Sequence, residues 1–272
     1  MVGIKFYYEP VMKFFEKIGL IFLNMLEEVG AFSIFSMQTI RLIFAKPFDF
    51  KSLLYQMHEI GVKSIPVGTI SSFFVGMVMA LQLGGPMEQQ IQGITTYMGG
   101  GISMAMVREL APVLTAVLLA GRVGSSIAAE IGTMKVTEQI DALSTLATNP
   151  VQYLSVPRFL ASVFTVPMVA TMAILVGVFG GAIISYVSLD IPIATYFESA
   201  RNMLRAKDLI SGVGKTFFFG AEIALISCYT GFRAKGGAQG VGQATIEAVV
   251  YSFMVIIVSD YFLTYIFQMF GL

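Results

Sequence analysis

Two long stretches without a charged residue constrain what this chain can fold into. They cover 24 residues at 64–87 and 31 residues at 159–189, whereas a membrane-spanning helix needs about 20 predominantly apolar residues. Charged residues make up 12% of the whole chain and the mean hydropathy is +0.78, while soluble domains usually carry about 25% charged residues. We therefore predict an all-α integral membrane protein with a span in each stretch.

Five spans account for the apolar part of the chain, which we treat as one membrane domain at residues 61–272. In the second span only 12 consecutive residues are uncharged. Because a span needs about 20 residues, Arg108 and Glu109 must also lie within the membrane. The fourth and fifth spans contain Glu222 and Asp260. The predicted spans are about residues 64–87, 102–122, 159–189, 212–232 and 247–271.

These four charged residues are candidates for function. Ionisable groups within a span usually face the protein interior or a wet cavity, and they often mark a transport route. Glu109 is the strongest candidate. The alternative is structural: Arg108 and Glu109 cap their span near the headgroups, or pair with Glu222 and Asp260.

The first 60 residues form a separate N-terminal segment in this prediction. Between residues 11 and 29, large apolar side chains repeat at helical spacing opposite charged and amide side chains. Such a helix should lie on the membrane surface without crossing it, because its polar face would be costly in hydrocarbon. Pro47 ends this piece. We expect no cleaved signal peptide, because no compact apolar core precedes a small-residue cleavage site.

A second amphipathic segment, at about residues 128–148, connects the second and third spans. Its apolar residues fall on one side at helical spacing and its acidic or hydroxyl residues fall on the other. A helix of this kind lies at the membrane surface, with its polar face free for water, headgroups or a partner protein. Periodicity alone leaves open whether it is a solvated loop helix or a docking helix. Residues 193–204 show a similar stripe and predict another surface helix.

The distribution of Lys and Arg predicts the orientation, because cytoplasmic loops near spans carry the excess. With the N-terminus inside, twelve of the 17 Lys and Arg residues fall on inner segments. The N-terminus and the 128–148 helix are then cytoplasmic and the C-terminus lies outside. An acidic cytoplasmic face between two spans suits a membrane subunit that sits in a groove of a soluble motor. The five residues assigned to the outer side are Arg108, Arg201, Arg205, Lys207 and Lys215.

The sequence offers no catalytic, metal or cofactor site. Residues 212–216 end like a phosphate-binding loop, but Leu209 stands where the first glycine is required and no buried strand precedes the loop. With one His and one Cys, the chain lacks a typical zinc constellation, and no Ser/His/Asp arrangement is evident. Any energy from ATP must therefore come from another subunit. The zero net charge argues against a nucleic-acid partner, and we expect Cys228 to serve packing.

Small residues recur every fourth position on two faces of the second span and its extension. Such faces allow helix backbones to approach closely. The sequence leaves open whether the contact lies within the chain or across a dimer. One face holds Gly121, Ser125 and Ala129, and the other holds Gly124, Ala128 and Gly132.

Several motifs resemble those of the MlaE-type permeases of bacterial ABC lipid transporters, over about residue 61 to the C-terminus. The motifs are VRELAPVL at 107–114, AGRVGS at 120–125, AEIGTM at 129–134, TEQIDA at 137–142, PRF at 157–159 and GAxGVGxAT at 237–245.

The resemblance implies a homodimer in the bacterial inner membrane, with a pair of cytoplasmic ABC ATPases that grip the helix between spans two and three. It also implies a periplasmic MCE-domain protein, and the partners can include a small cytoplasmic STAS-domain protein. The cargo would be glycerophospholipid, moved between the inner membrane and the periplasmic carrier in support of outer-membrane lipid asymmetry. The residues we expect to couple to the ATPase are Glu130, Lys135, Glu138 and Asp141.

The family's Arg-Glu pair lies near the lipid pocket and falls here on Arg108 and Glu109. We place the route between the first two spans, with Met79 and Leu83 contacting the lipid tails and the charged pair near the headgroup. The pocket should open toward the periplasm, because the charge count places that end outside. Two alternatives stay open: an ion-coupled secondary carrier that relays protons through its intramembrane carboxylates, and an assembly scaffold that transports nothing.

Overall fold

The structure, a computed structural model, describes residues 5–46, 49–90 and 94–271, and within these ranges it contains helices but no strand. Two short 3-10 turns and three π-helical turns, η3, η4 and η5, interrupt or join the α-helices. The α-helices are α1 Lys5–Leu42, α2 Phe50–Ile60, α3 Ile65–Gln90, α4 Met98–Ala105, α5 Ala111–Leu119, α6 Ser125–Val136, α7 Gln139–Thr145, α8 Val156–Leu189, α9 Ile193–Met203, α10 Ala206–Phe232 and α11 Gly237–Met269. The π-helical turns are Met106–Leu110, Ala120–Gly124 and Val151–Ser155.

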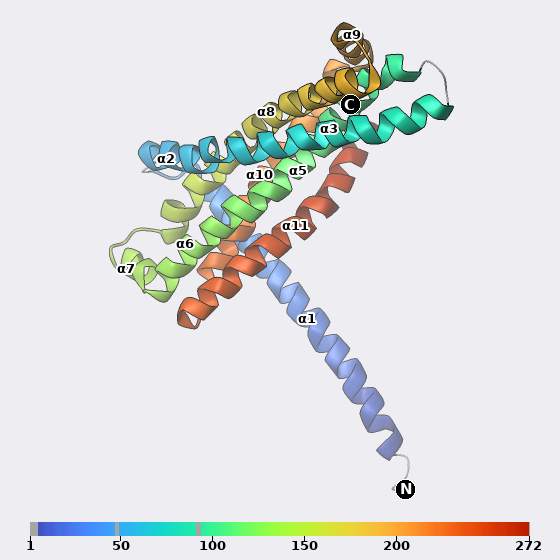
Figure 1. The fold of residues 1–272 in the computed structure, drawn as a ribbon. Helices are drawn as coiled ribbons and strands as arrows, with labels where there is room; N and C mark the ends of the chain where they lie inside the picture. Colours follow the sequence, from blue (N-terminus) through green and yellow to red (C-terminus); the bar gives the residue numbers. More distant parts are fainter. Residues whose placement is uncertain (1–4, 47–48, 91–93, 272) are drawn as a thin grey trace.

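Five helical segments of the described chain are long and apolar enough to cross a membrane, which confirms the predicted fold class. They run between two ends of one bundle (Figure 1). Helix α7 and the turn between α10 and α11 lie at one end, while α9 and the C-terminus lie at the other. The segments are Phe50–Gly84, Met98–Val136, Val151–Leu189, Ala206–Phe232 and Gly237–Met269.

The amphipathic segment predicted at 128–148 is not one helix, so its boundaries were wrong. Its first part belongs to α6, which extends the second span to Val136 because Ile127 and Ile131 are buried in the core. The chain then breaks at Glu138, which takes a left-handed conformation with φ of 61°. Only the second part forms a separate short helix, α7. Tertiary packing thus lengthens the span beyond what the charge pattern indicated.

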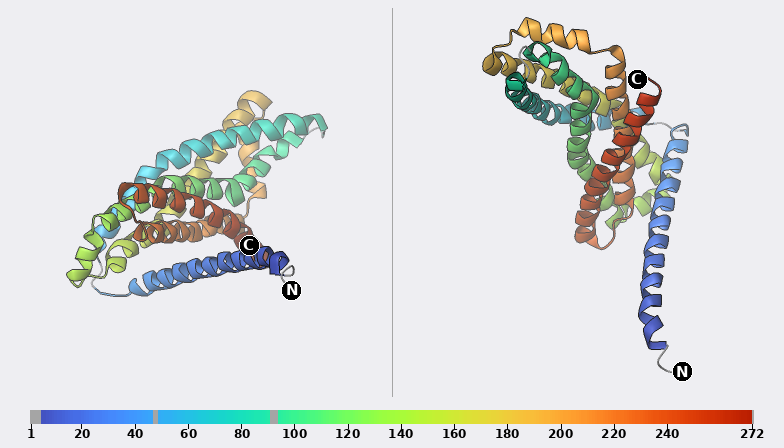
Figure 2. Two further views of the ribbon diagram at one scale, coloured as in Figure 1. Left: turned by 90° about the horizontal axis from the view of Figure 1, so that it is seen from below. Right: turned by 90° about the vertical axis from the view of Figure 1, so that its right-hand side faces the viewer.

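The N-terminal segment also differs from its predicted boundary at residue 60. Helix α2 continues through the 3-10 turn Val62–Ser64 into α3, so it joins the first span. Helix α1 is not one of the five candidate spans; it crosses the direction of the bundle at a steep angle in Figure 1 and extends beyond the bundle in Figure 2. Such an angle agrees with a helix that does not cross the membrane alongside the other five.

An ion pair attaches α1 to the bundle. Arg233, which follows α10, donates from Nη2 to Glu28 Oε1 at 2.7 Å, and its guanidinium lies 5.2 Å from the centre of the Tyr229 ring. Hydrogen bonds from Arg233 hold the pKa of the Glu28 carboxyl below its usual value. The contact fixes the C-terminal half of α1 beside α10.

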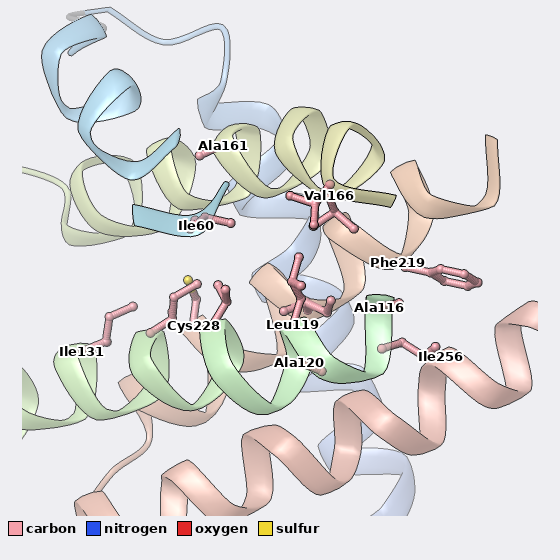
Figure 3. Close-up of a cluster of buried hydrophobic side chains, with 14 of the residues drawn as sticks. Ile60, Ala116, Leu119, Ala120, Ile131, Ala161, Val166, Phe219, Cys228 and Ile256 are labelled. Atoms are coloured by element: carbon pink, nitrogen blue, oxygen red, sulfur yellow. The ribbon is translucent and has the colours of Figure 1, made fainter. Parts of the chain in front are cut away.

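The main apolar core lies where α5 and α6 meet α8, α10 and α11 (Figure 3). Leu119, Val166 and Phe219 are fully or almost fully buried there. Cys228 is buried in the same cluster, as predicted for a packing residue.

Glycine residues set the closest helix contacts. A Cβ on Gly76 of α3 would lie 1.9 Å from the carbonyl O of Gly177 in α8, so these backbones touch. A Cβ on Gly124 would lie 2.9 Å from Ser227 Oγ in α10, and one on Gly132 would lie 3.3 Å from Ala234 Cβ. The small-residue face of Gly124 and Gly132 therefore packs within the chain.

Candidate functional site

The π-helical turn η3 positions the charged pair of the second span. In this turn the N–H of Ala111 bonds to the carbonyl O of Met106, five residues earlier, and such wide turns are frequent at functional sites. The neighbouring side chains Arg108 and Glu109 reach different partners. Arg108 donates from Nε to Asp208 Oδ1 at 2.8 Å, in the first turn of α10.

Lys215 of α10 is the centre of a charge cluster inside the bundle. Its side chain is 1% exposed, and Nζ lies 2.7 Å from Glu109 Oε2, 2.9 Å from Asp260 Oδ1 and 2.9 Å from Thr264 Oγ1. All three ammonium donors thus have acceptors. A single cation between two carboxylates leaves the cluster of Glu109, Lys215 and Asp260 with one excess negative charge.

The sequence reasoning missed Lys215. The Lys and Arg distribution assigns it to the outer side, whereas the structure buries it between two spans. Four of the five outer-side residues then remain. Its neighbourhood, residues 212–216, lies within α10 and forms no phosphate-binding loop. The available signal was a Lys in the middle of a candidate span, with carboxylates at Glu109 and Asp260 in two other spans. A buried ammonium needs such a partner.

Glu222 stands apart from this cluster. Ser259 Oγ of α11 donates to Glu222 Oε2 at 2.9 Å. The two residues border an open cavity of about 400 Å³ between α10 and α11, whose other walls include Phe218, Met254 and Val258. The direct pairing of Arg108 and Glu109 with Glu222 and Asp260 is therefore not observed: Glu109 and Asp260 both contact Lys215, and Glu222 bonds to a hydroxyl.

The two predicted tail-contacting residues pack against a second apolar cluster of the bundle. Met79 and Leu83 of α3 are partly buried and pack against an apolar cluster formed by α3, α4, α8 and α9. Met106 and Val107, which directly precede the charged pair, belong to that cluster. Met79 and Leu83 thus share a cluster with the two residues before the charged pair, whereas Glu109 itself faces Lys215 of α10.

The four coupling candidates lie at the opposite end of the bundle, on α6, α7 and the turn between them. Lys135 Nζ pairs with Asp141 Oδ1 at 3.0 Å, and Glu130 Oε2 pairs with Arg158 Nη2 of α8 at 2.8 Å. Ile140 is buried, whereas Glu138 and Asp141 are exposed. Helix α7 is therefore amphipathic, as its sequence predicted, and its polar face is accessible.

An open cavity of about 770 Å³ lies beside these residues, between α2 and α6. Its lining includes Glu59, Arg122 and Glu130. Arg122, within the π-helical turn η4, donates to Ser64 Oγ and to the carbonyl O of Glu59. This contact fixes the join between α2 and α3 next to the second span.

Comparison with known proteins identifies the family. The family model described as Permease MlaE matches residues 53–266. A probable ABC transporter permease protein of Rickettsia bellii is 41% identical over 247 residues, which cover 90% of this chain and 94% of that protein. A probable ABC transporter permease protein of Synechocystis is 43% identical over 216 residues, covering 79% and 81% of the two chains.

A plant protein is also similar: TRIGALACTOSYLDIACYLGLYCEROL 1, chloroplastic, of Arabidopsis thaliana. It is 39% identical over 214 residues, which cover 79% of this chain and 61% of the plant protein. The family match extends over nearly all of the five candidate spans. The chain is therefore a multi-pass membrane protein that belongs to the MlaE permease family, a family of ABC transporter permeases.

Proposed function

We propose that this permease moves glycerophospholipid between the bacterial inner membrane and a periplasmic carrier, in support of outer-membrane lipid asymmetry. The observation that carries the proposal is the charge cluster of Glu109, Lys215 and Asp260 within the spans. Charged side chains inside a membrane are costly and usually serve a route or a ligand.

The cluster suits a lipid headgroup because its charge is only partly enclosed. Lys215 is buried, but the side chain of Glu109 is 42% exposed and that of Asp260 is 20% exposed. Arg108, half exposed and paired with Asp208, precedes Glu109 in the sequence. A phosphate can approach Arg108 while an amine or hydroxyl of the headgroup approaches the carboxylates.

The apolar side chains of α3 supply the other half of a diacyl-lipid site. Ligand sites combine a mostly apolar lining with a few placed polar groups, and Met79 and Leu83 pack against the apolar cluster that contains Met106 and Val107, the two residues before the charged pair. The name of the Arabidopsis relative is that of a diacylglycerol lipid, which supports a lipid as the transported class.

We assign energy coupling to the end of the bundle that carries α7. A cytoplasmic ABC ATPase would contact the exposed acidic side chains of Glu138 and Asp141. Lys135 would hold that surface in place through its ion pair with Asp141, and Glu130 would join α6 to α8 through Arg158. In this proposal the permease works as a homodimer with a periplasmic MCE-domain protein and, on the cytoplasmic side, a small STAS-domain protein. The N-terminus is cytoplasmic and the C-terminus periplasmic, following the Lys and Arg distribution.

Photo-crosslinking tests the lipid route. A photoreactive residue at position 79, 83 or 109 should trap phospholipid in the detergent-purified complex, where bulk lipid has been removed. The matched control is position 172 of α8, because Met172 is exposed. Glu109→Gln and Arg108→Ala should impair lipid transport while the complex still assembles. If these positions trap no more lipid than the control and both variants transport normally, the cluster is structural.

A further inference from the structure

Arg158 forms a buried contact that the proposed lipid route and the ATPase contact do not use. Its side chain is 5% exposed, although it lies near the α7 end of the bundle. Nη2 pairs with Glu130 Oε2 at 2.8 Å, and Nη1 donates to the carbonyl O of Leu154 at 2.7 Å. Nε has no hydrogen-bond partner within the described ranges. Glu130 is therefore the main compensation for a buried positive charge.

The pair closes the base of a hairpin. We call residues 137–150, which contain α7 and join the second span to the third, the coupling hairpin. Glu130 lies on α6 before the hairpin begins, and Arg158 lies on α8 just after η5. Leu154, the other acceptor, belongs to η5. The Arg158 guanidinium thus connects α6, which precedes the coupling hairpin, to η5, which follows it.

The geometry favours transmission of force through this point. The coupling hairpin contacts the bundle mainly through α6, so a force applied to α7 reaches the spans through the base of the hairpin. Helix α8 in turn packs along the whole of α3, with backbones in contact at Gly76 and Gly177. Packed helices with close backbone contacts shift as rigid elements, because their interfaces tolerate little deformation.

We propose that the Arg158–Glu130 ion pair is a positioning contact that transmits movement of the coupling hairpin to α8 and α3. The proposal rests on the proposed function. In it, Glu130 acts on transport through its ion pair with Arg158, and it does not contact the ATPase. A guanidinium suits this role because its rigid fork reaches the carboxylate and the carbonyl at the same time. The carboxylate partner, Glu130, has a side chain that is 55% exposed. It can therefore shift with the hairpin more easily than a fully buried carboxylate could.

The test is the amount of lipid moved per ATP hydrolysed in the reconstituted complex. Glu130→Gln keeps the shape of the side chain but removes its charge, so lipid per ATP should fall about tenfold while ATPase association and hydrolysis stay within twofold. Arg158→Lys should lower the same ratio, because an ammonium cannot reach both acceptors. Glu130→Asp, which keeps the charge, should retain most of the coupling.

The matched control is Glu59→Gln. Glu59 lines the same cavity as Glu130 and also forms an ion pair, but with Lys63 of the same helical segment, so its loss should leave lipid per ATP unchanged. The proposal is overturned if Glu130→Gln transports normally, if it loses the ATPase, or if it fails to fold while Glu130→Asp folds. A wild-type complex that moves no lipid would instead reject the proposed function and is thus a distinguishable result.

Discussion

Replacing Lys215 by Met separates the structural role of the charge cluster from its role in transport. Methionine has a similar length and no charge. It leaves Glu109 and Asp260 facing each other without the ammonium that lies 2.7 and 2.9 Å from their oxygens. Breaking a buried ion pair by removing one partner costs about 3–5 kcal/mol.

The structure places the expected cost at the lower end of this range. Lys215 is buried, but both carboxylates keep some access to solvent and can be hydrated once the ammonium is gone. We therefore expect a loss of about 3 kcal/mol, which lowers the ratio of folded to unfolded protein about a hundredfold. The triple variant Lys215→Met, Glu109→Gln, Asp260→Asn removes all three charges together, so most of that stability should return.

The assay pairs an unfolding titration in mixed micelles with lipid transport in proteoliposomes. If the cluster binds the headgroup, the triple variant regains stability but its transport remains low. Normal transport by the triple variant would refute the headgroup assignment. Unchanged stability of Lys215→Met would refute the claim that the lysine compensates the two carboxylates.

Three further predictions concern other parts of the molecule. Glu138→Lys with Asp141→Lys should weaken ATPase association in a pull-down, since each lost charge-assisted contact costs about 1.5–3 kcal/mol; undiminished recovery would show that this face is only solvated. The Glu28 ion pair stabilises α1 docking above the carboxyl's ordinary pKa, and this stability should be lost as pH falls through the lowered pKa. Spin-label distances between α1 and α10 that stay constant down to pH 2 would contradict this. Gly76→Ala should destabilise the bundle by about 1–3 kcal/mol, because the new Cβ meets the α8 backbone. The control Gly242→Ala should not clash, because no atom lies within 4 Å of its Cβ. Equal melting temperatures of the two variants would contradict the close contact between α3 and α8.

The number and approximate position of the spans could be predicted because hydrophobic length is a local property. A run of about 20 apolar residues has few alternatives to crossing a membrane. Span ends depended instead on tertiary packing. Helix α6 continues past the predicted end of its span because Ile131 is buried in the core, and the sequence pattern around it suited a surface helix equally well.

The candidate site could be predicted only in part from the sequence, because it also depends on tertiary packing. Arg108 and Glu109 stood out because they interrupt an apolar stretch. Their partners Asp208 and Lys215 come from another span, about 100 residues later, and side-chain pairing between distant spans follows from helix packing. The charge count assigned Lys215 to the outer side because it lies near the start of the predicted span at 212–232. The π-helical turn η3 has no recognised sequence pattern.

ATP-dependent phospholipid movement in proteoliposomes tests the central claim most directly. The permease would be reconstituted alone and with its cytoplasmic ATPase, and labelled phospholipid would be followed with ATP, with a non-hydrolysable ATP analogue, and with an imposed proton gradient. We predict movement only with the ATPase and hydrolysable ATP. Movement driven by the proton gradient in the absence of the ATPase would contradict the account and favour an ion-coupled carrier that uses the intramembrane carboxylates.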